Sequence, residues 1–340
     1  MSSSTFSSRT AQSAALVWIF LATFTSLVAA GLVVDQRLWW RMGTPFQTGL
    51  TSAGPGSVIT QLVNVLDYDA YLYDHMGTAK YMREADVLFV GNSRGLYAFR
   101  PEGYQPHLDR YGLRGYTLAF LGGSDGFALE LIRRYDLRPK LVIVNGDAFF
   151  DDTWGRLGAV ARDRGRWNSW KFYFESVAAW EAAMRLHRWI PPWRFYSHER
   201  DHHVIYRSVQ TGGIFLRYAL PAPRDLTTRH PDTFTQDERD LSEKMFPAQL
   251  KTLRTFAAEV TSRGGAMIMT FAPYPELNNV LLTRRLSEAT GIPFVEVWPT
   301  PLVSYTGSHM GGESAVRFMD ALFEALRREP AFRQVAGDPR

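Results

Sequence analysis

The sequence contains no cysteine, so disulfide bonds, thiolate nucleophiles and cysteine metal sites are excluded. It also lacks a basic stripe. The net charge is only +4, and charges of both signs are scattered along the chain, which argues against nucleic-acid binding. What the chain does have is apolar material. With 46% hydrophobic residues among 340, it is long enough to build a large core.

One N-terminal stretch lacks charge altogether. Residues 11–34 contain no Asp, Glu, Lys or Arg, and about 20 apolar residues suffice to cross a bilayer core. Trp39 and Trp40 follow, between Arg37 and Arg41, as an aromatic and basic belt. A cleaved signal peptide and a buried helix are the alternatives. We expect an uncleaved, single-pass anchor in a bacterial-type inner membrane, with the soluble part outside the cytoplasm.

Beyond residue 83, short apolar runs alternate with amphipathic segments. The runs are residues 87–90, 116–120, 141–144, 266–271 and 293–297, and the helical segments are 127–135, 249–262, 281–290 and 314–328. Continuous apolar strands that alternate with helices predict an α/β fold, a doubly wound parallel sheet in three layers. Ligands of such sheets bind at the carboxyl ends of the strands, so the strand ends are where chemistry is expected.

The long segment between the third and fourth strands is rich in aromatic residues and too long for a plain loop. We interpret it as an inserted lid or subdomain with a helix over about 169–187. The expected division is a tail 1–10, a transmembrane helix 11–34, a stalk 35–82, a first domain part 83–151, the insertion 152–246, a second domain part 247–330 and a tail 331–340.

Small polar motifs follow the predicted strands. Gly91-Asn92-Ser93-Arg94 comes directly after the first strand. A serine at a strand-to-helix turn exposes its hydroxyl, and the helix N-terminus offers amides to an oxyanion. His309 precedes the last helix, whose loop returns to the same sheet edge, so the two residues can pair as nucleophile and base. The alternatives are a capping serine and a surface histidine.

The order of these motifs resembles the SGNH (GDSL-like) hydrolases, and especially their membrane-anchored, envelope-associated relatives. Gly91-Asn92-Ser93-Arg94 resembles the first block of that family, Gly122-Gly123 the second, and Ser308-His309 the last. The resemblance covers residues 84–150 and 247–328. It implies an SGNH-type fold, Ser93 as nucleophile, His309 as base, and Gly122 or Gly123 with the Ser93 amide as the oxyanion hole.

The sequence departs from the family pattern at two places. The family's Asp three residues before the His is Thr306 here, which leaves Glu296, Asp147 or Thr306 itself as groups that could orient His309. The third block of the family has Gly-x-Asn, and its Asn is also missing, because Gly146 is followed by Asp147 and Ala148.

Neighbouring side chains could replace the missing groups. Asn92 or Asn145 could donate to the oxyanion in place of the third-block Asn. Arg94 either binds a substrate anion or forms a salt bridge. His198 and His202 are four residues apart, as metal ligands can be, but their polar surroundings favour a solvated loop, so we expect neither a metal nor a cofactor.

These features predict a membrane-anchored serine esterase or O-acyltransferase that acts on acyl esters, acetyl first among them, of an envelope or extracellular carbohydrate. An acetyltransferase would need a donor from across the membrane, which calls for a multi-span membrane partner. The alternative is an inactive SGNH-fold scaffold or glycan-binding protein of a membrane complex. Thr306 and Ala148 motivate that alternative, because they mark the two departures.

Overall fold

The computed structural model describes residues 16–26, 57–59, 64–75, 77–151, 153–155, 158–171, 204–217, 224–225, 233–274, 278–304 and 309–338. The chain divides into two compact units, Met1–Ser57 and Val58–Arg340. In the first unit, residues 16–26 form a helix with exposed apolar side chains. Within the described ranges no helix is both long and apolar enough to cross a bilayer. The rest of 11–34 lies outside those ranges, so the anchor stays a prediction.

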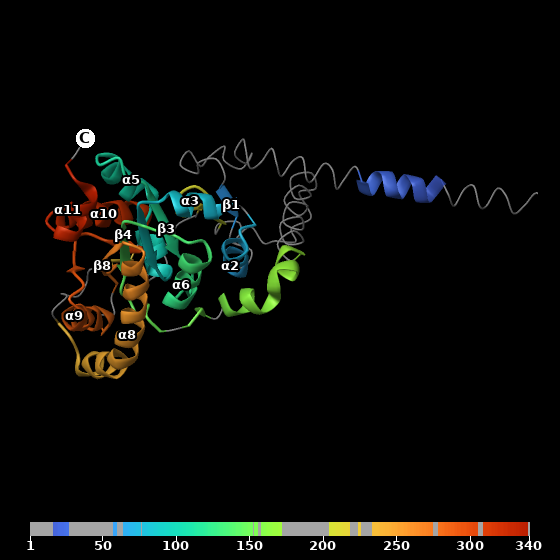
Figure 1. The fold of residues 1–340 in the computed structure, drawn as a ribbon. Coiled ribbons are helices and arrows are strands. Elements are labelled where there is room, and N and C mark those ends of the chain that lie inside the picture. Colours follow the sequence, from blue (N-terminus) through green and yellow to red (C-terminus); the bar gives the residue numbers. More distant parts are fainter. Residues whose placement is uncertain are drawn as a thin grey trace, which may run out of the picture. The chain divides into compact units, whose positions relative to one another are not determined.

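A five-stranded parallel sheet forms the centre of the second unit, and it confirms the predicted α/β class (Figure 1). Its strands run in the order β3-β2-β4-β8-β9, and every neighbouring pair is parallel. They are β2 (Val87–Gly91), β3 (Gly115–Ala119), β4 (Leu141–Asn145), β8 (Ala266–Thr270) and β9 (Phe294–Val295). The first residue of each strand lies within two residues of the first residue of a predicted apolar run.

Both faces of the sheet are buried, because successive strand side chains point to opposite faces. Val87 and Phe89 belong to one apolar cluster, whereas Leu88 and Val90 belong to the other. The first cluster includes side chains of α5 (Pro101–Asp109), α10 (Gly312–Leu326) and α11 (Pro330–Ala336). The second includes side chains of α6 (Asp125–Arg134) and α8 (Gln236–Ser262). Helices therefore pack on both faces (Figure 1).

The strand order reverses between β2 and β4. The chain passes from β2 to β3 on one side and then returns to β4 on the other. At such a switch point the connections leave in opposite directions, and a crevice opens beyond the carboxyl ends of the two strands. The motifs of residues 91–94 and 145–147 follow these two strands, so the topology places both at the switch point.

Helix α8 corrects the predicted boundary at residue 246. It begins at Gln236, where Thr235 and Glu238 form a capping box, and it continues through Pro247 to Ser262. A proline inside a helix removes one backbone hydrogen bond, which is why the sequence favours a later start. Met245 and Phe246 before this proline and Leu250 after it pack against the same core cluster, which holds the helix together across that position.

Part of the expected stalk belongs to the domain. Helices α2 (Asn64–Leu72) and α3 (Thr78–Glu84) place Tyr68, Tyr71 and Met82 in the main core cluster. The glycine-rich sequence before these two helices predicts a linker. The apolar side chains of the helices themselves, however, are buried against the sheet. The expected C-terminal tail likewise contains α11, whose Phe332 is buried.

The described parts of the insertion pack onto the domain. A helix covers residues 158–171, earlier than the predicted 169–187, whose remainder lies outside the described residues. Strands β5 (Val204–Ser208) and β6 (Ile214–Arg217) form a hairpin in a small sheet with β1 (Ser57–Ile59). A further strand, β7 (Arg224–Asp225), pairs with β10 (Val303–Ser304).

Arg207 fastens this hairpin to the sheet. Its side chain is buried, donates to the carbonyls of Gly212 (2.8 Å) and Thr117 (3.0 Å), and lies 4.4 Å from the ring centroids of Tyr71 and Phe120. A buried guanidinium is tolerated only with such hydrogen bonds and ring contacts.

Replacing Arg207 by alanine should therefore destabilise the protein by about 3 kcal/mol, because two buried carbonyls lose a charged donor. Chemical denaturation measures the change. Arg138→Ala is the matched control: Arg138 pairs with Asp136 at an exposed site, where an ion pair contributes little to stability. Equal effects of the two substitutions would contradict the role given to Arg207.

Candidate functional site

Helix α4 (Ser93–Ala98) starts immediately after β2, with Asn92 as its N-cap. The Asn92 side-chain oxygen accepts from the backbone amides of Arg94 (3.0 Å) and Gly95 (3.4 Å). These bonds satisfy two of the first amides of the helix. Ser93 is consequently the first helical residue and is half-buried, at the strand-to-helix turn where the sequence predicts it.

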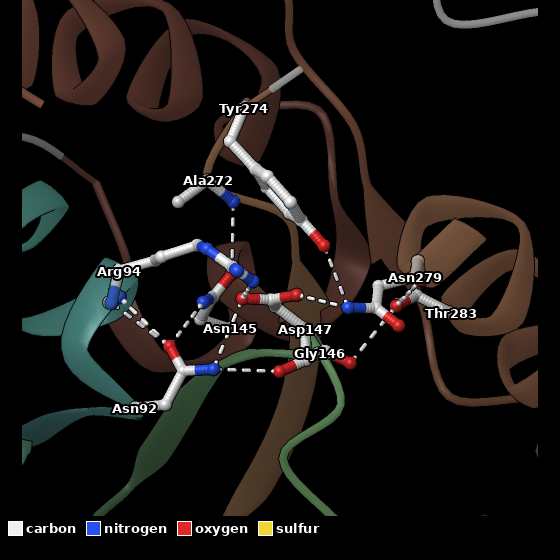
Figure 2. Close-up of polar contacts among 10 residues, drawn as sticks. Asn92, Arg94, Asn145, Gly146, Asp147, Ala272, Tyr274, Asn279 and Thr283 are labelled. Atoms are coloured by element: carbon white, nitrogen blue, oxygen red, sulfur yellow. Dashed lines mark hydrogen bonds and ion pairs between the residues drawn. The ribbon is translucent and has the colours of Figure 1, made fainter. Parts of the chain in front are cut away.

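Asp147, just beyond β4, is the centre of a polar network (Figure 2). Its side chain is fully buried, and its carboxylate forms an ion pair with Arg94. It also accepts from the side-chain amides of Asn92 (3.1 Å) and Asn279 (2.6 Å), and its backbone carbonyl accepts from Asn92 (2.7 Å). The buried carboxylate at the switch point is thus paired with a cation and with two amide donors.

The guanidinium of Arg94 is held from a second side. It lies 3.5 Å from the ring centroid of Tyr274, and the Tyr274 hydroxyl accepts from Asn279 (2.7 Å). Asn279 therefore links the carboxylate and the ring between which Arg94 sits (Figure 2). Of the two roles expected for Arg94, the salt bridge is present.

The two asparagines that the sequence offers as oxyanion donors have structural partners. The Asn92 amide is directed at Asp147, as described above. Asn145 donates to Asn92 (3.3 Å) and accepts from the backbone amide of Ala272 (2.9 Å). The two side chains connect the ends of β2, β4 and β8. Their observed contacts therefore hold these three strand ends together.

His309 lies against helix α4. Its ring stacks on Tyr97, with centroids 4.4 Å apart and an angle of 24° between the planes. Ser93 and Tyr97 are four residues apart in the helix and so share one face. The structure thus brings His309 to helix α4, which begins at Ser93; the pairing of the two residues stays a prediction.

Burial lowers the pKa of His309 to about 4, and the positive charge of Arg94 contributes in the same direction. The negative charge of Asp147 acts oppositely but less strongly. The imidazole is therefore neutral at pH 7, which is the form that accepts a proton.

The predicted oxyanion glycines form a tight turn beside β2. The Gly123 amide donates to the Phe120 carbonyl (3.0 Å), and Gly122 has φ of 65°, a conformation that favours glycine. The Phe120 amide donates to the Gly91 carbonyl (3.1 Å), which attaches the turn to the strand before Ser93. Because the Gly123 amide is used within the turn, Gly122 is the better candidate donor.

The groups expected to orient His309 lie in different places. Glu296 accepts from Arg284 (2.7 and 2.8 Å) and from Trp298 (2.6 Å), so its carboxylate is committed at the end of β9. Thr306 lies outside the described residues. Asp147 is close enough to His309 to raise its pKa, which makes it the one of the three whose influence on the histidine is seen.

Three site residues were missed by the sequence reasoning. Tyr97 has a detectable signal, since it follows Ser93 by one helical turn. Tyr274 has a weaker signal, since it follows the predicted strand 266–271 at the edge where chemistry is expected. Asn279 has none, because only the tertiary fold brings it to Asp147. Within the described ranges no cluster of three potential metal-ligating side chains occurs, and His198 and His202 lie outside those ranges.

The neutral state of His309 has a consequence for stability. Its folded pKa lies below the ordinary 6.5, so between pH 6.5 and about 4 the unfolded chain binds a proton that the folded chain does not. Stability is therefore lost as the pH falls through this window. In His309→Gln the fall should be shallower by up to about 1.4 kcal/mol per pH unit.

Urea denaturation at several pH values from 4 to 7 measures this slope. His75→Gln is an independent comparison, because burial also lowers the pKa of His75 to about 4. Parallel stability curves for wild type and His309→Gln would show that His309 titrates alike in both states, and would contradict its burial as a neutral ring.

Comparison with known protein families, with curated proteins and with solved structures found no match for this chain. Its function is therefore argued from the site itself.

Proposed function

We propose that this chain is a serine-dependent acyl-ester hydrolase or O-acyltransferase of SGNH type, with Ser93 as nucleophile and His309 as base. The observation that carries the proposal is the stacking of His309 on Tyr97, one turn beyond Ser93 on the same helix. A serine at the start of helix α4 and a neutral imidazole stacked on the same helix are the two groups that nucleophilic acyl transfer needs.

In the proposed reaction, Ser93 Oγ attacks the ester carbonyl carbon while the His309 imidazole accepts the hydroxyl proton. The tetrahedral oxyanion binds to the backbone amides of Ser93 and Gly122, because the next two amides of α4 already donate to Asn92. The bond to the leaving alcohol then breaks, and the imidazolium returns the proton to that alcohol. Water or a sugar hydroxyl attacks the acyl-serine in the second half-reaction.

Asp147 and Arg94 tune this reaction in opposite directions. Proton transfer creates an imidazolium, which the charge of Asp147 stabilises and the charge of Arg94 destabilises. Because the two form an ion pair, the net field at His309 is smaller than either charge alone would produce. The proposed machinery is thus a dyad supported by a distant carboxylate.

The resemblance and the N-terminal sequence suggest where the chemistry takes place. We assign the soluble part to the extracytoplasmic side of a bacterial-type inner membrane, attached by one helix within residues 11–34, and the substrate to acyl esters of an envelope carbohydrate. If acetyl transfer is the reaction, a multi-span membrane partner delivers the donor, because one helix cannot form a transport path.

An inactive scaffold or glycan-binding protein is the second candidate. One observation favours it: the carboxylate of Asp147 already accepts from Asn92, Arg94 and Asn279, as a carboxylate kept for structure would. The two candidates differ in whether Ser93 reacts, and that can be measured directly.

Labelling of the full-length protein in detergent with a serine-reactive fluorophosphonate tests the proposal. Wild type should be labelled and should hydrolyse p-nitrophenyl acetate. Ser93→Ala and His309→Ala should each lose at least about 100-fold in rate, the contribution of a nucleophile or a general base. Ser262→Ala, which removes an exposed helix-end hydroxyl bonded to the Glu259 carbonyl, should leave the rate unchanged. A folded but unreactive wild type would favour the binding protein.

A further inference from the structure

The insertion contacts the candidate site at two places. Residues 153–155 lie against the turn that carries Gly122, and the β5–β6 hairpin packs on the outer strand β3 and on helix α4. Both contacts involve described residues, one beside the Gly122 turn and the other beside Tyr97, on which His309 stacks.

The first contact is a close approach of two backbone segments. Ser124 Oγ donates to the Thr153 carbonyl (2.5 Å), and Asp125 accepts from the Asp151 amide (2.9 Å). Gly155 packs so tightly that a Cβ atom there would overlap the Gly122 carbonyl oxygen. The position of the Gly122 turn therefore depends on residues of the insertion.

The helix that follows is itself fixed to the domain. Arg164 forms an ion pair with the buried Asp69, and His75 Nε2 lies 2.7 Å from Ser169 Oγ. Tyr73 donates to the Ala161 carbonyl (3.1 Å). Segment 153–155 thus lies against the Gly122 turn, and the described helix that comes after it in the sequence is attached to the domain by these contacts.

The second contact lies next to Tyr97, the residue on which His309, the proposed base, stacks. The Thr117 amide of β3 donates to the Thr211 carbonyl of the hairpin turn (2.7 Å). Ile214, at the start of β6, then joins Leu96, Tyr97 and Ala119 in a small apolar cluster. Tyr97 is the residue on which His309 stacks, so the hairpin supports the platform under the histidine.

We propose that Thr153 and Gly155 position the oxyanion turn, that Ile214 positions the Tyr97–His309 stack, and that the insertion is consequently a built-in part of the acyl-transfer site. This inference rests on the proposed function. It assigns two separate parts of the insertion to the two groups that must be aligned with Ser93, where small displacements cost large factors in rate.

Gly155→Ala tests the first half. The added methyl group should displace the Gly122 turn and lower kcat for p-nitrophenyl acetate by about 10-fold, with KM within about twofold, because the oxyanion forms only in the transition state. Gly165→Ala is the matched control: Gly165 has a similar positive φ, but no atom lies within 4 Å of a Cβ there. It should suffer the same backbone strain without the loss of kcat.

Ile214→Ala tests the second half. Loosening the apolar cluster should admit water to the Tyr97–His309 stack. Because burial is the largest cause of the low pKa of His309, the acid limb of the pH–rate profile should shift upward from about pH 4. Val209→Ala truncates another buried residue of the hairpin turn outside the Tyr97 cluster, and its acid limb should not shift.

The outcomes distinguish a failure of the proposed function from a failure of the positioning roles. An unreactive wild type would overturn the proposed function. A reactive wild type with equal kcat in Gly155→Ala and Gly165→Ala, or an unshifted acid limb in Ile214→Ala, would overturn the corresponding positioning role. If Gly155→Ala does not fold, as judged by circular dichroism, Ser124→Ala replaces it, and an unchanged kcat in that variant would overturn the first half.

Discussion

A buried carboxylate cannot remain charged in a protein interior without partners, since the desolvation of such an ion costs several kcal/mol. Asp147 is fully buried at the switch point of the sheet, and the surrounding architecture supplies its partners. Arg94 comes from α4, Asn92 from the end of β2, and Asn279 from α9 (Asn278–Thr290). One charge thereby aligns residues 92–94 with Asn279, two stretches that are distant from each other and from Asp147 in the sequence.

That alignment determines what Ser93 can do. Asn92 donates to Asp147 with its amide nitrogen and caps α4 with its oxygen, so the position of the helix start follows from the carboxylate. The Arg94 side chain is directed at Asp147 and Tyr274. These contacts give it a structural role and do not require that it bind a substrate. Ser93, between these two residues, is left as the side chain that the network does not use among the described contacts.

Local pattern explains what could be predicted from the sequence. The five parallel strands follow from continuous apolar runs such as residues 141–144, which only a sheet covered on both faces buries. The place of Ser93 follows from the glycine and asparagine that end the first run. Asn279 and the early start of α8 at Gln236 could not be predicted, because the first depends on a tertiary hydrogen bond and the second on core packing that overrides Pro247.

The low pKa of His309 limits its strength as a base in the proposed reaction. A ring whose pKa is lowered to about 4 is fully available as an acceptor, but its weak basicity limits the driving force for taking a proton from serine. A preorganised oxyanion turn compensates for a weak base, because it stabilises the same transition state from the other side. In the proposed mechanism, the contacts of the insertion with the Gly122 turn would therefore matter most, because the proposed base is buried and the Arg94 charge lowers its pKa.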